Sequence, residues 1–238
     1  MPQPNPGTTP APGLSDMRRA YHADRLLEAD AGHDPLALFH RWFEQARQSA
    51  PAPWCEPNAM TLTTVAPGTS RPSARIVLLK DLDETGFVFF TNYQSRKARE
   101  LDAAPHAALV MHWPWLERQV RVEGRVEKVA RRISEEYFRG RPRGSQLGAW
   151  VSDQSTPMTR EQMDQRLADL EQQFADRDVP CPPHWGGYRL LLLPGAGAGA
   201  LLPGAGVIEF WQGRPDRLHD RLEYRLESTG WTRRRLGP

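Results

Sequence analysis

The chain has 238 residues, with 31 Lys and Arg against 29 Asp and Glu, so its formal net charge is only +2. This balance excludes a polybasic protein that binds nucleic acids or membranes through bulk charge, and a hydrophobic content of 39% indicates a folded, globular chain. The basic residues comprise 28 Arg and only 3 Lys. Two explanations of this excess of Arg stay open: codon drift in a GC-rich genome, or the use of Arg guanidinium groups to bind phosphate and carboxylate groups.

The first half of the chain predicts one helix followed by a series of strands. Residues 1–16 have the composition of a disordered tail, and we expect a single domain over 17–238. Asp34 can cap a helix over 34–47, and Pro35 suits its first turn. Ser95 can cap a short helix over 95–101. Apolar runs that end at turn signals predict strands at 59–65, 74–79, 87–91, 107–113 and 118–129.

The strand over 118–129 has the clearest alternation in the sequence. Val120, Val122 and Val126 share one face, and polar side chains occupy the other. The polar positions are Gln119, Arg121, Glu123, Arg125 and Glu127. This pattern predicts a strand with one buried and one polar face.

The second half of the chain predicts further short helices and strands. Ser134 can cap a helix that ends at Phe138, and another short helix is expected over 145–151. Thr159 and Gln162 have the spacing of a capping box for a helix over 159–174. Strands are expected at 188–193, 207–211, 217–225 and 231–235. Many short strands with few peripheral helices predict a mostly β (α+β) fold, built as one barrel domain.

Several common kinds of functional site have no support in the sequence. The Gly/Ala-rich stretch 194–206 fits no nucleotide-binding loop, and it is interpreted as a flexible hairpin insertion. The seven His are scattered, and Cys55 and Cys181 are isolated, so we expect neither a metal site nor a disulfide scaffold. Neither the N-terminus nor the interrupted apolar run 190–208 has the pattern of a signal peptide or a membrane span. We therefore expect a cytoplasmic protein.

The expected strand over 217–225 begins with an unusual set of side chains. Its period of two places Arg217, His219 and Arg221 on one face, where the positive charges repel each other unless an anionic or electron-rich group lies there. Two interpretations stay open, a ligand-binding face or a solvated face whose counter-ions come from Asp216, Asp220 and Glu223.

Other cations are spaced in ways that suit anion binding. Arg75 and Lys80 stand at the two ends of an apolar strand, and Arg96 and Lys97 open a short helix. Tyr137, Arg141 and Ser145 recur at intervals of four. Each feature alone is compatible with an ordinary surface, but together they indicate at least two anion sites, which two phosphates could occupy.

Taken in order, six stretches of the sequence resemble the pyridoxine/pyridoxamine 5′-phosphate oxidase family. They are RIVLLK (75–80), FFTNYQSRKA (89–98), HWPWLERQVRVEG (112–124), YFRGRPRGSQLGAWVSDQS (137–155), HWGGYR (184–189) and IEFWQGRPDRLHDRLEY (208–224). The resemblance runs from about residue 34 to the C-terminus, with a weaker match at 18–21. It implies an FMN-binding split β-barrel and a homodimer with FMN at the subunit interface.

The same resemblance implies a reaction. Pyridoxine or pyridoxamine 5′-phosphate is oxidised to pyridoxal 5′-phosphate, as part of vitamin B6 biosynthesis and salvage. A hydride passes from C4′ to FMN, O2 reoxidises the flavin to give H2O2, and the amine substrate also releases NH3. The resemblance implies no nucleic acid partner, no membrane partner and no bound metal.

By matching position, the resemblance also assigns residues. FMN contacts fall to Arg75, Ile76, Val77, Leu78, Leu79, Lys80, Phe90, Thr91, Arg96, Lys97, Gln119, Gln154, Ser155, Trp211 and Arg221. The residues assigned to the 5′-phosphate of the substrate are Lys80, Tyr137, Arg141 and Ser145. Those assigned to its pyridine ring are Arg217, Leu218 and His219. Further substrate contacts near the N-terminus are assigned to Arg18, Arg19 and Tyr21. Arg217 and His219 are the catalytic candidates.

The sequence departs from the family pattern at three places. Ala20 stands where the family commonly has Glu, Gly144 replaces an acidic residue that is often found there, and 194–206 is an insertion. Two alternatives to the oxidase are a split-barrel flavoprotein with another substrate, and a non-catalytic protein that binds pyridoxal phosphate or flavin.

Overall fold

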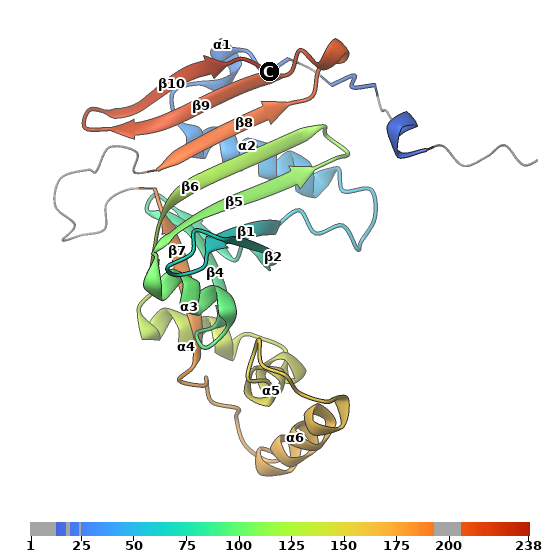
Figure 1. The fold of residues 1–238 in the computed structure, drawn as a ribbon, viewed down its shortest axis with the longest axis vertical. Helices are drawn as coiled ribbons and strands as arrows, with labels where there is room; N and C mark the ends of the chain where they lie inside the picture. The colour runs from blue at the N-terminus through green and yellow to red at the C-terminus, as the bar shows by residue number, and fades with distance from the viewer. Residues whose placement is uncertain (1–12, 18–19, 24, 193–205) are drawn as a thin grey trace, which may run out of the picture.

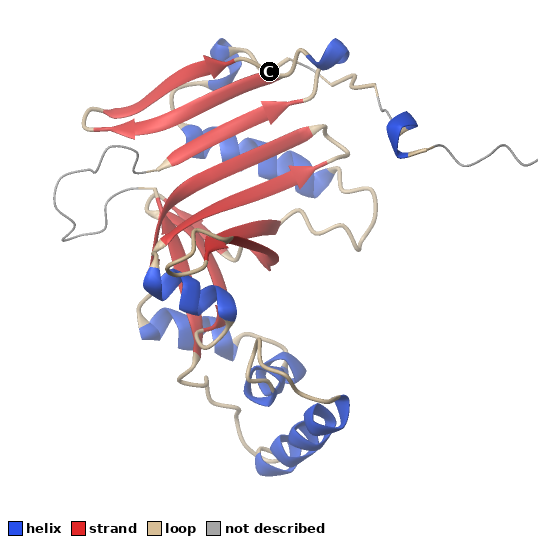
Figure 2. Ribbon diagram, viewed as in Figure 1, coloured by secondary structure: helices blue, strands red, loops and turns tan. Residues whose placement is uncertain are grey.

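The computed structural model describes residues 13–17, 20–23, 25–192 and 206–238. Within these residues, ten antiparallel strands form one curled sheet with the order β10-β9-β8-β6-β5-β1-β2, from which β7, β4 and β3 branch at β6 (Figures 1 and 2). The strands are β1 (Ala59–Val65), β2 (Pro72–Leu78), β3 (Asp81–Asp83), β4 (Gly86–Asn92), β5 (His106–Trp113), β6 (Arg118–Lys128), β7 (Trp185–Leu191), β8 (Val207–Gln212), β9 (Asp220–Glu227) and β10 (Gly230–Leu236).

Short helices surround this sheet. The α-helices are α1 (Glu28–Ala31), α2 (Pro35–Gln48), α3 (Arg96–Ala103), α4 (Arg131–Arg139), α5 (Arg143–Val151) and α6 (Arg160–Gln173), and 3-10 helices cover Leu14–Asp16 and Pro215–Arg217. No helix among the described residues is long and apolar enough to cross a membrane. The mostly β, α+β architecture expected from the sequence is confirmed.

Strand β6 belongs to both parts of the sheet. Its first half, 118–123, pairs with β8, and its last residues, 126–128, pair with β7. Gly124 lies at the change of partner, where an added Cβ would lie 2.4 Å from the backbone oxygen of Leu191. Only glycine allows this close approach of two strands, so Gly124 permits the switch that splits the barrel.

The main core lies between the sheet and α2. Val120 and Val122 are fully buried, as the alternation in β6 predicts. From α2, the Trp42 ring packs edge-on against Phe210 with 5.3 Å between ring centroids, and Phe39 packs in the same way against Phe87 at 5.0 Å. Asp34 caps α2 by accepting a hydrogen bond from the Leu36 N–H at 2.8 Å, which confirms the expected helix start.

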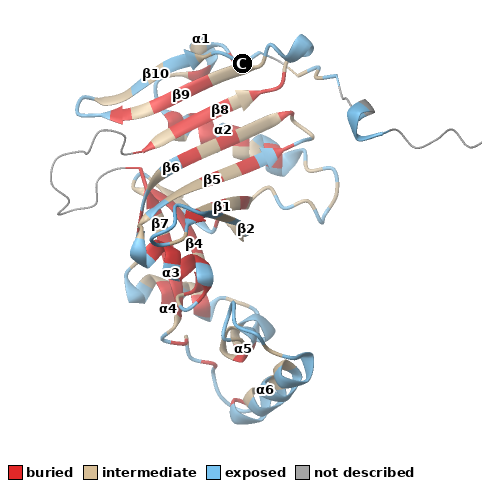
Figure 3. Cartoon of the chain, viewed as in Figure 1, coloured by how far each residue is buried: buried red, intermediate tan, exposed pale blue. Residues whose placement is uncertain are grey.

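A second, smaller core holds α4, α5 and α6 together at the other end of the molecule (Figure 3). It contains Phe138, Leu147, Phe174, Val179 and Trp185. Thr159 and Gln162 form the expected capping box at the start of α6. Because Trp185 opens β7, this core ties the helices to the branch of the sheet that contains β4.

Two local expectations are wrong. Ser134 does not cap α4, which begins at Arg131; its hydroxyl is buried inside the helix and accepts the Gly187 N–H at 3.1 Å. The strand expected from Arg217 begins only at Asp220. Asp216 and Arg217 have φ of 56° and 61°, and this left-handed backbone cannot continue a strand ladder. Arg217 and His219 therefore do not alternate with Arg221 along one strand.

Two further expectations concern segments that are mostly outside the described residues. The expected N-terminal tail includes 1–12, and the expected insertion includes 194–205. Both stay predictions.

Candidate functional site

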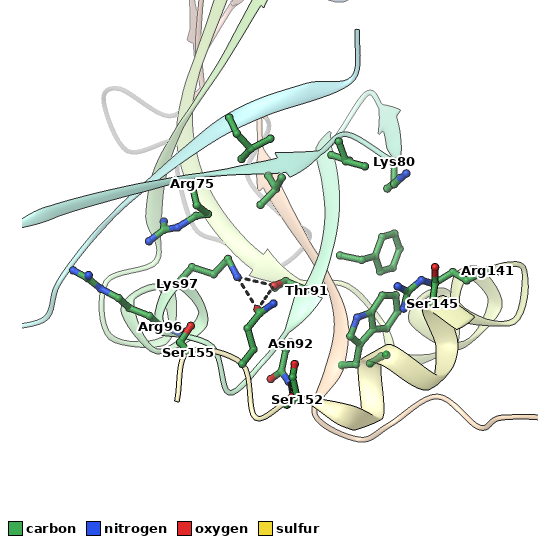
Figure 4. Close-up of a pocket in the computed structure, with 18 of the residues that line it drawn as sticks. Arg75, Lys80, Thr91, Asn92, Arg96, Lys97, Arg141, Ser145, Ser152 and Ser155 are labelled. Carbon is green, nitrogen blue, oxygen red and sulfur yellow. Dashed lines mark hydrogen bonds between the residues drawn. The ribbon is translucent and has the colours of Figure 1, made fainter. Parts of the chain in front are cut away.

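A cavity of about 930 Å³ opens between β2, β4, α3 and α5. Figure 4 shows cationic side chains on two sides of it, with Arg75, Arg96 and Lys97 on one side and Lys80 and Arg141 on the other. Most residues assigned from the family resemblance line this pocket: Arg75, Ile76, Val77, Leu78, Lys80, Phe90, Thr91, Arg96, Lys97, Tyr137, Arg141, Ser145, Gln154 and Ser155. Leu79, by contrast, is 8% exposed within the main core.

Lys97 is a buried cation on the first side of the pocket. Its Nζ donates to Gln154 Oε1 at 2.8 Å and to Thr91 Oγ1 at 3.0 Å (Figure 4). It also donates to Ser95 Oγ at 3.3 Å. Within the described residues, none of its contacts is a carboxylate. Burial and then the nearby charge of Arg75 lower the pKa of Lys97 to about 8. An anion in the pocket would supply the missing counter-charge.

Arg75 and Arg96 complete this cationic side, and one carboxylate holds both. Glu100 Oε2 accepts from Arg75 Nη2 at 3.3 Å, and its Oε1 accepts from Arg96 Nε at 2.8 Å. Ser155 joins the group because its Oγ accepts the Arg96 backbone N–H at 3.1 Å. Three cations and the Ser155 hydroxyl thus lie together where a phosphate could bind.

Arg141 dominates the second side of the pocket. Its Nη1 is buried and has no hydrogen-bond partner among the residues that the structure describes, and its guanidinium lies over the Trp185 ring at 4.7 Å from the centroid. Burial lowers the pKa of Arg141. Because an unpaired buried donor is costly, this side chain is suited to a ligand that supplies acceptor oxygens. Ser145 lies beside Arg141 in Figure 4.

Three parallel aromatic rings line the pocket and form one wall of it. The Phe90 ring stacks on Tyr137 with 4.1 Å between centroids and on Trp185 with 5.4 Å. The interplanar angles are 15° and 11°. Such a wall suits planar, aromatic ligands.

Apart from Leu79, the remaining assigned residues that the structure describes lie outside this pocket, and several of them form a second group. Tyr21, Trp211 and His219 pack together, with 5.7 Å between the rings of Tyr21 and Trp211, 5.2 Å between Tyr21 and His219, and 4.6 Å between Trp211 and His219. Gly213 makes room for this contact, since an added Cβ would lie 2.5 Å from the Tyr21 ring. Arg217 and Leu218 are exposed beside it, and Leu218 is 68% exposed.

The backbone fixes the protonation pattern of His219. The N–H of Arg214 donates to His219 Nδ1 at 3.1 Å, so the neutral ring carries its proton on Nε2. Burial and then the charge of Arg217 lower the pKa of His219. His219 is therefore a neutral hydrogen-bond donor at Nε2.

Arg221 and Gln119 are adjacent to the second group. Trp211 on β8 is paired with Gln119 on β6 and with Arg221 on β9. Arg221 is held by Glu209, with Nε to Oε1 at 2.8 Å and Nη2 to Oε2 at 3.1 Å. The ion pair raises the pKa of Arg221.

The two groups stand apart within one chain. Strands β1, β5, β6 and β8 separate β2, which lines the pocket, from β9 in the hydrogen-bonded order of the sheet. At about 4.8 Å per strand, β2 and β9 are roughly 24 Å apart along the sheet. Arg18 and Arg19 lie outside the described residues, so their position relative to either group stays a prediction.

Two contributors to the pocket were missed by the sequence reasoning. Trp185 lies in the quoted stretch HWGGYR, and its place just before two glycines gave no hint that it stacks on Phe90. Glu100 follows Arg96 by four residues, a spacing that usually marks an ordinary surface ion pair. No group of three or more His, Cys, Asp or Glu in the described ranges could hold a metal ion.

Two family models and many known proteins match this chain. A family model described as pyridoxamine 5′-phosphate oxidase matches residues 46–173, and one described as the pyridoxine 5′-phosphate oxidase C-terminal dimerisation region matches 205–238. Relatives named pyridoxine/pyridoxamine 5′-phosphate oxidase from Ectopseudomonas mendocina (strain ymp) and Azotobacter vinelandii (strain DJ / ATCC BAA-1303) are each 51% identical, over 94% of this chain and 98% of theirs.

Solved structures show the same fold. PhzG from Burkholderia lata 383, in complex with tetrahydrophenazine-1-carboxylic acid, has a TM-score of 0.78 at 28% identity and covers 91% of this chain and 99% of its own. A pyridoxamine 5′-phosphate oxidase-related, FMN binding protein from Nostoc punctiforme has a TM-score of 0.66 at 15% identity, covering 87% of this chain and 100% of its own. These neighbours confirm the expected split barrel.

Proposed function

Because the chain belongs to the pyridoxine/pyridoxamine 5′-phosphate oxidase family, a family of FMN-dependent oxidoreductases, we propose that it converts pyridoxine or pyridoxamine 5′-phosphate to pyridoxal 5′-phosphate. The pocket with two separate cationic sides is the observation that carries this proposal. One side suits the phosphate of the cofactor, and the other suits the phosphate of the substrate.

The residues of the pocket fit FMN. The buried ammonium of Lys97 has no carboxylate partner in the described part of the chain, and Arg75 and Arg96 lie beside it, so these three would hold the cofactor phosphate. Thr91, Gln154 and Ser155 would add hydroxyl and amide contacts, and the residues of β2 would line the flavin. When bound, FMN supplies a hydride acceptor, a chemistry that no side chain provides.

Arg141 is the proposed anchor of the substrate. Its unpaired Nη1 would donate to the 5′-phosphate, together with Lys80, Ser145 and the Tyr137 hydroxyl. Binding energy from this remote phosphate would hold the substrate's C4′ in place for reaction. The aromatic wall of Phe90 and Tyr137 would exclude water from the planar rings.

We propose that the second group completes the site from the other subunit of a homodimer. Trp211, Arg217, His219 and Arg221 all lie in the stretch that matches the dimerisation region. The exposed side chains of Ile76, in the pocket, and Leu218, in the second group, are surfaces that a partner would cover. A two-fold axis would then place one chain's pocket against its partner's second group, twice per dimer.

Within that group, Arg217 is the proposed main catalytic residue. Its left-handed backbone costs roughly 1–3 kcal/mol, a strain that clusters at functional sites. Its exposed guanidinium could cover the pyridine ring of the substrate. His219 would donate from Nε2 to a polar group of the substrate, since its Nδ1 is occupied by Arg214. Arg221 would stabilise negative charge that develops on the reduced flavin.

The overall reaction consumes O2. Pyridoxine 5′-phosphate and O2 give pyridoxal 5′-phosphate and H2O2; pyridoxamine 5′-phosphate, O2 and H2O give pyridoxal 5′-phosphate, NH3 and H2O2. The use of O2, a cytoplasmic location and the lack of nucleic acid and membrane partners stay predictions from the sequence.

A direct assay tests the proposal. We expect the purified protein to bind FMN and turn yellow, and to form peroxide and pyridoxal 5′-phosphate from either substrate in air. A protein that cannot be loaded with FMN contradicts both flavin functions. A loaded protein that oxidises neither phosphate, or that oxidises unphosphorylated pyridoxine equally well, contradicts the substrate assignment.

A further inference from the structure

A buried carboxylate stands behind the cofactor side of the pocket without lining it. Glu100, on α3, is 3% exposed. Its side chain accepts hydrogen bonds from three elements: from Thr64 on β1 at 2.5 Å, from Ser73 on β2 at 2.6 Å, and from Arg75 and Arg96, on β2 and α3. A buried acid with so many donors has a fixed position.

The two oxygens of Glu100 have different partners. Oε2 accepts from the two hydroxyls and from Arg75 Nη2, whereas Oε1 accepts from Arg96 Nε alone among the described residues. Burial opposes ionisation of Glu100, but the hydrogen bonds from Ser73, Thr64 and Arg96 outweigh it and lower its pKa to about 2. Glu100 is therefore an anion over the whole working range of pH.

This anion also sets the charge of the subsite. Arg75, Arg96 and Lys97 bring three positive charges and Glu100 one negative charge, which leaves a net charge of +2. A phosphate monoester carries about −1.5 to −2 at neutral pH. The subsite with Glu100 thus matches the charge of one phosphate dianion.

We propose that Glu100 is the positioning residue of the cofactor-phosphate subsite, acting through Arg96, and that it holds this guanidinium toward the pocket before FMN binds. The proposal rests on the proposed function, because it takes FMN as the ligand. Arg75 has other anchors, the Leu62 carbonyl at 3.3 Å and the Thr64 hydroxyl at 2.5 Å. The Arg96 side chain is 58% exposed, and within the described residues Glu100 is the one side chain that its guanidinium contacts.

Glu100→Gln separates this role from a general effect of charge. The amide oxygen of Gln can replace Oε2, which keeps the contacts to Thr64, Ser73 and Arg75. Its NH2 group then faces Arg96 Nε. Because both groups are hydrogen-bond donors, the hydrogen bond is lost and the Arg96 side chain is free to move into solvent. If charge alone mattered, loss of the anion would strengthen phosphate binding; if positioning matters, phosphate binding weakens.

The test is a double-mutant cycle on flavin binding. Dissociation constants of FMN and of riboflavin are measured by quenching of flavin fluorescence for the wild type, Glu100→Gln, Arg96→Met and the double variant. We expect Glu100→Gln to weaken FMN binding roughly tenfold, since a hydrogen bond to a charged group is lost, and to leave riboflavin binding unchanged. In the Arg96→Met background, Glu100→Gln should cause no further loss.

Three results would overturn the proposal: tighter FMN binding in Glu100→Gln, equal weakening of FMN and riboflavin, or the same loss with and without Arg96. Glu44→Gln is the matched control, because Glu44 pairs with Arg47 on α2 and lies outside the pocket. If Glu100→Gln does not fold, Arg96→Met must still weaken FMN binding selectively. A wild type that binds no FMN contradicts the proposed function instead.

Discussion

Lys97 is a buried ammonium whose charge depends on what the pocket contains. Without an anion, burial and Arg75 hold the pKa of Lys97 at about 8, below its ordinary value of 10.5. A bound phosphate dianion favours the charged ammonium and raises that pKa again. Binding of FMN is therefore coupled to the uptake of a proton wherever Lys97 would otherwise be neutral.

This coupling predicts how FMN binding depends on pH. Because the pKa of Lys97 is higher in the complex than in the free protein, FMN affinity should be constant just below pH 8 and fall as the pH rises above about 8. Calorimetry in buffers with different ionisation enthalpies should detect the proton uptake. Lys97→Met should bind FMN weakly and lose this pH dependence; a wild-type affinity that stays flat to pH 9.5 contradicts the assignment.

Arg141 is a half-buried cation for which a separate role is proposed. Because its Nη1 has no partner in the described residues and lies on the other side of the pocket, Arg141→Gln should raise the KM for pyridoxine 5′-phosphate roughly ten- to a hundredfold. FMN binding should be unchanged. Arg132→Gln, an 80% exposed Arg on α4, is the control and should alter neither. Loss of FMN together with the rise in KM would show that the two subsites are not separate.

At the scale of elements, the sequence pattern predicted those structural features that depend only on residues close together in the chain. The alternating valines of β6 and the capping residues of α2 and α6 act locally, and the structure has them as expected. Arg217 was misplaced because its left-handed backbone leaves no periodic signal. The burial of Glu100 was missed because it depends on hydroxyls of β1 and β2, which no spacing along α3 reveals.

Two glycines that the sequence does not distinguish have different structural roles. Gly124→Ala would place a Cβ 2.4 Å from the Leu191 carbonyl oxygen, so we expect a loss of about 1–3 kcal/mol in the free energy of unfolding. Gly144→Ala, in the first turn of α5 with no atom within 4 Å, should be neutral or stabilise by up to about 1 kcal/mol. Chemical denaturation of both variants measures this, and equal effects would refute the role given to Gly124.

At the scale of the whole molecule, the proposed site is divided between two distant parts of one chain. The pocket contains the cations proposed to bind phosphate, while Arg217 and His219 lie beyond the intervening strands of the sheet. From the sequence alone, the family resemblance supplied both sets of residues. Which residues share one chain's pocket could not be predicted, because that depends on the order of the strands.

Subunit complementation tests the division. Arg141→Gln and Arg217→Ala dimers, each with little activity at substrate concentrations near the wild-type KM or below it, should recover activity in that assay when they are mixed, unfolded and refolded together. Random pairing gives half heterodimers, each with one intact site, so about a quarter of the wild-type activity should return. Refolding each variant alone is the control. No recovery would mean that both residues act in a site formed by a single chain.

The pairing of β6 with both β7 and β8 has a consequence for how the protein unfolds. Because β8 and β7 are both hydrogen-bonded to this one strand, neither part of the barrel can detach without breaking its ladder. Thermal unfolding of the barrel should therefore be a single cooperative transition. The amide protons of Val120 and Val122 should exchange with solvent only through global unfolding, and the slowest-exchanging amides should map the seam that joins the cofactor pocket to the dimerisation region.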